Sequence, residues 1–151
     1  MSSMTRKQHV DYWLHGASEN MKDMRATIKS KRRAMAMFCG HLAVEKMLKG
    51  LCAVRGINIK RDHKLLKLAK ISGLITTLTE AQEDELINIT SFNIEARYDD
   101  FKQRFNETCT PQYVTEWSKK IIIWYKNLKK IILQERATLP NNVADTQSLI
   151  K

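Results

Sequence analysis

The dipeptide Arg97-Tyr98 combines two side chains suited to contacting a nucleic acid or a nucleotide. A planar guanidinium binds phosphate through paired hydrogen bonds, and an adjacent aromatic ring stacks on a base. The alternative is that Arg97 neutralises Glu95, Asp99 or Asp100 together with the free carbonyls at a helix end. Both interpretations stay open on the sequence alone.

A second group of ionisable residues, Glu45, Lys46 and Lys49, lies in a segment that is otherwise apolar nearly all round. Charged groups in such a segment are costly unless they pair or serve a site. Lys46 and Lys49 are therefore candidates for binding a ligand phosphate. Glu45 and Lys49 are also one helical turn apart, and we favour the interpretation that these two residues form a structural polar network.

Two histidines have spacings that suggest specific contacts. His41 shares a helix face with Glu45 at a metal-ligand spacing, but no second motif completes a coordination shell. We therefore expect His41 to be a core or dimer-facing residue, and we predict no metal site. His63 precedes a short helix, where it either contacts a nucleotide or satisfies a loop carbonyl or helix cap.

The spacing of apolar residues predicts helices for the segments that carry these side chains. A first amphipathic helix has one apolar stripe with steps of three and four residues. The residues of that stripe are Val10, Trp13, Leu14, Ala17, Met21, Met24 and Ile28. A central, mostly covered helix is predicted from about 33 to 54 and ends before Gly56, and a short helix from about 63 to 71 ends at Gly73.

Capping residues mark two further helices in the second half of the chain. Thr79 and Gln82 form a capping-box pattern that begins a helix ending near residue 96, and the stretch from 98 to 109 is predicted to be a polar connection. Thr110 and Pro111 begin the last helix, whose apolar seam has the spacing of a bundle. That seam comprises Val114, Trp117, Ile121, Trp124, Leu128 and Ile131. Further apolar residues widen it, which indicates deep burial or a second subunit.

Composition favours a single all-α domain. The chain has 151 residues but only 5 glycines and 2 prolines, so it is poorly punctuated for turns and suited to long helices. We predict an up-and-down bundle of four to five helices over residues 5–138. The segment 139–151 lacks periodicity and is predicted to be a loosely ordered tail.

The charge balance points to polyanions. A formal net charge of +10 favours RNA, DNA or nucleotide binding, whereas the alternative is a solvated basic surface that serves solubility. The three cysteines have neither metal nor disulfide spacing, which is typical of reduced thiols. No signal peptide and no membrane-spanning run is evident, so we expect a soluble, cytoplasmic protein without cofactors.

Five motifs in order resemble the HEPN family, named for higher eukaryotes and prokaryotes nucleotide-binding. They are a first helix with Trp13 and Ala17, the segment Ala43-Val44-Glu45-Lys46-Met47-Leu48-Lys49, then Gly56 with His63-Lys64-Leu65-Leu66-Lys67-Leu68, then Ala96-Arg97-Tyr98, and a hydrophobic final helix. The resemblance spans about residues 8 to 135. It implies a helical bundle, usually a two-fold homodimer, often partnered in prokaryotes with a minimal nucleotidyltransferase.

The resemblance also implies a specific kind of active site, from which this chain departs. Many members are ribonucleases, including toxins of toxin–antitoxin pairs, with an Arg followed after four to six residues by a His. Here Arg97 matches the Arg, but Lys102, Gln103 and Arg104 occupy the positions available to the His. Lys and Arg move protons poorly near neutral pH, so the usual Arg/His chemistry is not expected.

Three functions follow as hypotheses. The first is a dimeric HEPN module that binds RNA or a nucleotide without the usual ribonuclease chemistry. The second is a ribonuclease toxin with an atypical proton donor, Lys102 or His63 of a neighbouring chain, and the third is a scaffold that docks a minimal nucleotidyltransferase. The residues predicted to bind RNA or a nucleotide are Arg97, Tyr98, Lys46, Lys49, His63, Lys102 and Arg104, with Arg97 the one catalytic candidate.

Overall fold

The computed structural model describes residues 4–59 and 61–141, and within these ranges the secondary structure is helical apart from turns and a single bridge residue. The prediction of an all-α bundle is confirmed. The helices are α1 (Arg6–Lys29), α2 (Arg33–Val54), α3 (Leu65–Ser72), α4 (Glu80–Arg97), α5 (Asp99–Thr108) and α6 (Pro111–Ala137), with a 3-10 turn at Leu74–Thr77. Most of the predicted tail, from residue 142 onward, lies outside the described residues.

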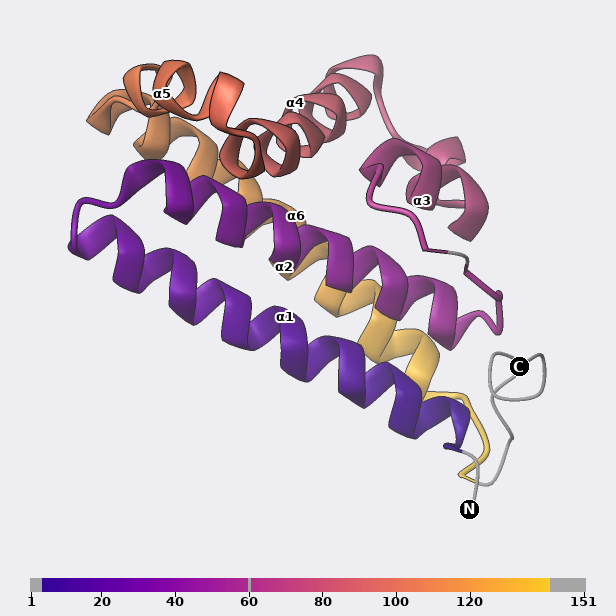
Figure 1. Cartoon of the computed structure of the whole chain (residues 1–151). Helices are drawn as coiled ribbons and strands as arrows, with labels where there is room; N and C mark the ends of the chain where they lie inside the picture. Colours follow the sequence, from indigo (N-terminus) through magenta and orange to yellow (C-terminus); the bar gives the residue numbers. More distant parts are fainter. Residues whose placement is uncertain (1–3, 60, 142–151) are drawn as a thin grey trace.

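Helix α2 is the centre of the bundle and contacts α1, α3, α4, α5 and α6. Figure 1 shows α1 and α2 as a long antiparallel pair, with α6 crossing behind α2. Gly40 permits this close packing, because a Cβ built there would lie 2.5 Å from Cδ1 of Ile121. The observed span of α2 agrees with the predicted one, and Gly56 follows it with a φ of +68°, a conformation that glycine adopts readily.

The predicted caps are present at the helix starts. Thr79 accepts a hydrogen bond from the backbone N–H of Gln82, while the Gln82 side chain accepts one from the N–H of Thr79. Thr110, ahead of Pro111, caps α6 by accepting a hydrogen bond from the backbone N–H of Tyr113, without a reciprocal side-chain bond. These local bonds satisfy backbone donors that a helix start otherwise leaves free, so the sequence alone locates both starts.

The prediction of a polar connection from 98 to 109 is wrong, because α5 occupies most of it. The chain breaks only at Tyr98, whose φ of −104° and ψ of 128° are extended, and a ten-residue helix follows. Asp99 and Asp100 favour its start through the helix dipole. Phe105 anchors it, being 1 % exposed with its ring centroid 5.6 Å from that of Phe92, whereas Phe101 is exposed.

Two smaller details of the apolar pattern also differ from expectation. The apolar spacing of α3 predicts that Ile71 faces inward, but Ile71 is exposed, and the helix begins at Leu65 rather than His63. In α6, Ile132 is buried whereas Ile123 is 58 % exposed, so the widened seam is only partly covered within one chain. No helix among the described residues is long and apolar enough to cross a membrane.

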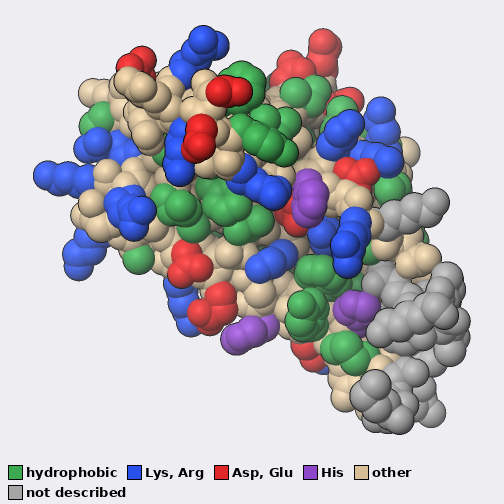
Figure 2. All heavy atoms as spheres, in the orientation of Figure 1, with side chains coloured by type: hydrophobic (Ala, Val, Ile, Leu, Met, Phe, Trp, Pro, Cys, Tyr) green, Lys and Arg blue, Asp and Glu red, His purple; other side chains and the backbone are tan. Residues whose placement is uncertain are grey.

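Basic side chains are not spread evenly over the surface. Figure 2 shows Lys and Arg gathered where α1 turns into α2 and again around α3, with Asp and Glu between these groups. This arrangement places cations beside the loop that carries His63.

Candidate functional site

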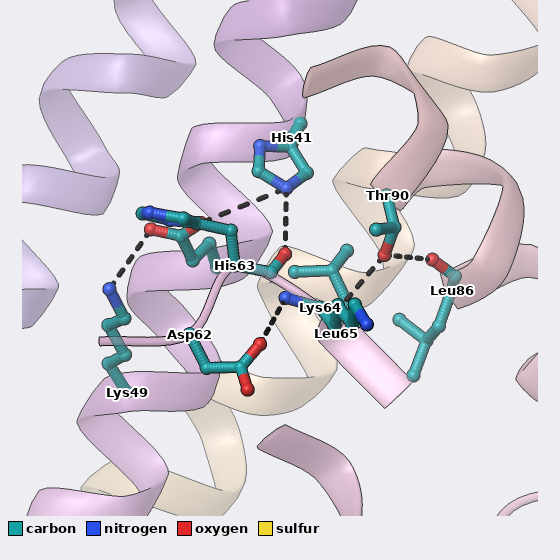
Figure 3. Close-up of polar contacts among 9 residues, drawn as sticks. His41, Lys49, Asp62, His63, Lys64, Leu65, Leu86 and Thr90 are labelled. Atoms are coloured by element: carbon teal, nitrogen blue, oxygen red, sulfur yellow. Dashed lines mark hydrogen bonds and ion pairs between the residues drawn. The ribbon is translucent and has the colours of Figure 1, made fainter. Parts of the chain in front are cut away.

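Glu45 is the centre of a polar cluster between α2 and the loop before α3 (Figure 3). Its carboxylate accepts a hydrogen bond from Nζ of Lys49 at 3.1 Å and contacts Nδ1 of His63 at 2.8 Å. The Glu45 side chain is 6 % exposed, whereas that of His63 is 55 % exposed. A buried carboxylate thus holds an exposed imidazole by one ring nitrogen, and the other nitrogen of His63 has no partner among the described residues.

His41 lies fully buried beneath this contact. Its Nε2 lies 3.3 Å from the backbone carbonyl of His63, which can only accept, so the neutral ring carries its proton on Nε2. Burial lowers the pKa of His41, although the nearby carboxylate of Glu45 acts in the opposite direction. Nδ1 of His41 is buried without a hydrogen-bond partner in the described structure. His41 and Glu45 together therefore fix both the backbone and the side chain of His63.

Two further residues fix the loop and the start of α3. Asp62 accepts a hydrogen bond from the backbone N–H of Lys64 at 2.9 Å and pairs with Lys67 at 2.9 Å. Thr90 of α4 accepts a bond from the N–H of Leu65 at 3.1 Å. The sequence analysis missed both residues. An Asp side chain that accepts a bond from the backbone N–H two residues on forms an Asx turn, a recognisable local pattern, whereas nothing in the sequence marks a mid-helix Thr as a partner of α3.

The two lysines predicted to bind phosphate lie in different environments. Lys49 is mostly buried, bound to Glu45, and its Nζ lies 5.4 Å from the ring centroid of Trp13. Lys46 is half-buried beside Gly16 of α1, and its side chain makes no hydrogen bond or ion pair with a described residue. Lys49 is thus engaged within the polar cluster, and Lys46 remains available to a ligand.

Arg97 and Tyr98 lie at the junction of α4 and α5, with both side chains exposed. Arg97 forms no ion pair with Glu95, Asp99 or Asp100, nor any other side-chain hydrogen bond within the described ranges. Lys102 and Arg104 of α5 are likewise exposed and unpaired there. The four predicted residues of this region therefore present free cations and an exposed ring to solvent.

The structure does not bring the two groups of predicted residues together within one chain. Thr90 contacts the start of α3, and Arg97 lies seven residues further along α4, a rise of about 10 Å along the helix axis. Figure 1 shows α5 and α3 at opposite ends of α4. Glu45, Lys49 and His63 form one site, and Arg97, Tyr98, Lys102 and Arg104 line another.

The buried thiols complete the inventory of reactive groups. Cys39, Cys52 and Cys109 are free and buried, and burial raises the pKa of Cys52 to about 11 and that of Cys109 to about 12. Thiols with so high a pKa are poor nucleophiles near neutral pH. Within the described ranges, no group of three or more His, Cys, Asp or Glu is placed to hold a metal ion.

Comparison with known proteins decides the family. The family model of the HEPN domain matches residues 10–129, which is most of the chain. The chain belongs to the HEPN family. The crystal structure of an archaeal HEPN homologue has the same fold, with a TM-score of 0.59 and 22 % identity, over 82 % of this chain and 97 % of that one. None of the curated proteins matches the sequence.

The range matched to the HEPN domain includes Glu45, His63 and Arg97. It also includes the positions after Arg97 at which this chain lacks the expected His. Lys102, Gln103 and Arg104 stand on α5, and all three are exposed. The imidazole of His63, which the Glu45 carboxylate contacts at 2.8 Å, instead belongs to the cluster around Glu45.

Proposed function

We propose that this HEPN protein binds RNA or a nucleotide as a homodimer, without the usual Arg/His ribonuclease chemistry. The observation that carries the proposal is the exposed guanidinium of Arg97, which no described acid neutralises, beside the exposed ring of Tyr98. A free guanidinium retains its full attraction for phosphate, and the adjacent ring offers a stacking surface for a base. Lys102 and Arg104 extend the same cationic surface along α5.

Exposed apolar side chains beside Arg97 support the dimer. Ile94, Tyr98 and Phe101 are 50 %, 56 % and 43 % exposed, and they follow one another at steps of four and three residues across the junction of α4 and α5. Clustered large apolar side chains on a surface are typical of an interaction site. A second copy packed on Ile94 and Phe101 places two copies of Arg97 near one interface.

Arg97→Ala tests the binding proposal. We expect the affinity for a short, single-stranded RNA to fall about fivefold at about 0.1 M salt, because each phosphate contact on a single strand contributes ~0.7 to the salt slope. Fluorescence anisotropy across a salt series measures both quantities, and light scattering on the same samples gives the mass of the complex.

The matched control for Arg97→Ala is Lys126→Ala, which removes one exposed, unpaired cation from α6. If the wild-type protein does not bind RNA at low salt, the proposal is wrong. Equal losses of RNA affinity in the two variants also contradict the proposal, because they would mean that only the net charge of the protein matters.

A specific observation favours ribonuclease activity as the second candidate. The contact between Glu45 and Nδ1 of His63 orients the ring as a proton-transferring imidazole requires. In cleavage, Nε2 of His63 would take the proton of the 2′-hydroxyl, the 2′-oxygen would bond to phosphorus, and the 5′-oxygen would leave with a proton from water. Because His63 and Arg97 are apart in one chain, this reaction requires the two residues to come from different copies.

If the protein is a ribonuclease toxin, expression of the wild type should arrest growth. Expression of His63→Ala or of Arg97→Ala should not. Cleavage of total RNA, followed on a gel, should disappear in the same two variants. Equal growth of cells that express the wild type and the variants removes this candidate and leaves the binding proposal standing.

A further inference from the structure

A hollow of about 380 Å³ lies between α3 and α4. It is lined by Leu66, Ile87 and Thr90, which we call its floor, and by Lys64, Lys67 and Lys70. Ile87 is 53 % exposed and presents aliphatic surface to solvent beside these lysines. All the charged residues that line the hollow are lysines.

The three lysines follow one another at every third residue from the start of α3. Lys64 is the N-cap of the helix, and Lys67 and Lys70 within it are about 4.5 Å apart along the helix axis. Asp62 neutralises Lys67 in part, through the contact at 2.9 Å. The ammonium groups of Lys64 and Lys70 make no hydrogen bond or ion pair with any residue that the structure describes, so both are available to an anion.

The floor has a fixed shape and little hydrogen-bonding capacity of its own. The hydroxyl of Thr90 accepts a bond from the N–H of Leu65 and donates one to the carbonyl of Leu86 at 2.8 Å, as Figure 3 shows. Its donor is therefore already used within the fold. The hollow offers a ligand aliphatic contact on Leu66 and Ile87 and positive charge from the lysines. It offers no free hydrogen-bonding group in its floor that would distinguish one base from another.

We propose that this hollow holds one nucleotide of a single-stranded RNA, with the base on Leu66 and Ile87 and flanking phosphates on Lys64 and Lys70. The inference rests on the proposed function and adds a second contact region, remote from Arg97. The volume lies at the small end of the range for ligand pockets, which suits one base rather than a helix of a protein partner. Proteins that bind single strands combine a positively charged groove with aromatic side chains on which the bases stack, and here the aliphatic surface of Leu66 and Ile87 takes the place of the aromatic ring.

The test compares the double variant Lys64→Ala/Lys70→Ala with Lys29→Ala/Lys126→Ala. The control removes the same charge from exposed, unpaired positions on α1 and α6. With a short oligoadenylate, we expect the first variant to lose about 25-fold in affinity at about 0.1 M salt, and its salt slope to fall by about 1.4, since two phosphate contacts contribute ~0.7 each. The control should lose much less.

Methyl NMR on the wild type locates the base. Oligoadenylate should shift the methyl resonances of Leu66 and Ile87, whereas an abasic oligonucleotide of equal charge should leave them unmoved. Equal losses in the two double variants, with the wild type still binding, overturn the site and leave RNA binding intact. Equal methyl shifts with the abasic strand, or with polyglutamate, overturn the nucleotide as occupant, and a wild type that binds no RNA overturns both proposals.

Discussion

Glu45→Ala is expected to lower the free energy of unfolding by about 3 kcal/mol and the melting temperature by about 10 °C. The substitution removes the acceptor that Lys49 and His63 share and leaves the Lys49 ammonium, 11 % exposed, without its partner. Breaking one side of a largely buried ion pair costs more than the pair itself contributes, because the remaining charge stays desolvated. Thermal unfolding followed by circular dichroism measures the loss.

Glu45→Gln and Glu19→Ala are the controls for this prediction. Glutamine keeps the volume of the side chain and one acceptor oxygen. The loss of stability in Glu45→Gln should therefore be smaller than in Glu45→Ala. Glu19 pairs with Lys22 on the surface of α1, and its removal should change stability by less than about 0.5 kcal/mol. An unchanged melting temperature in Glu45→Ala, combined with lost RNA binding, would instead make Glu45 a ligand-contacting residue.

The parts of the fold that follow from local chemistry were predictable. Some features depend only on residues a few positions apart, so they can be predicted directly from the sequence. They are the caps at Thr79 and Thr110 and the left-handed turn at Gly56. The ion pair of Glu45 and Lys49 belongs to the same class, because one helical turn separates the two residues.

The parts that depend on distant contacts were not predictable. His63 meets Glu45 across 18 positions of sequence, and Thr90 meets Leu65 across 25, and neither pairing has a local sequence pattern. Helix α5 was missed because its composition is polar, and one buried ring, that of Phe105, turns it into an element of the bundle. The hollow beside α3 was likewise not predictable, because it forms only where α3 and α4 pack against each other.

Phe105→Ala is expected to detach α5 from the bundle and to weaken RNA binding with it. Phe105 is the buried residue of α5, and truncation of a buried Phe costs about 3 to 5 kcal/mol through lost transfer free energy and the cavity left against Phe92. Because the rest of α5 is exposed, the loss should appear locally, as fast hydrogen exchange of the α5 amides while those of α2 stay protected.

Gln103→Ala is the control, since it truncates an uncharged side chain at an exposed position of the same helix. We expect this control to lower stability by less than about 1 kcal/mol and to leave the α5 amides protected. If α5 positions Lys102 and Arg104 for RNA, then Phe105→Ala weakens RNA binding although it alters no charge. Unchanged affinity in Phe105→Ala, with α5 shown to be released, would exclude α5 from the RNA-binding surface and leave Arg97 to act without it.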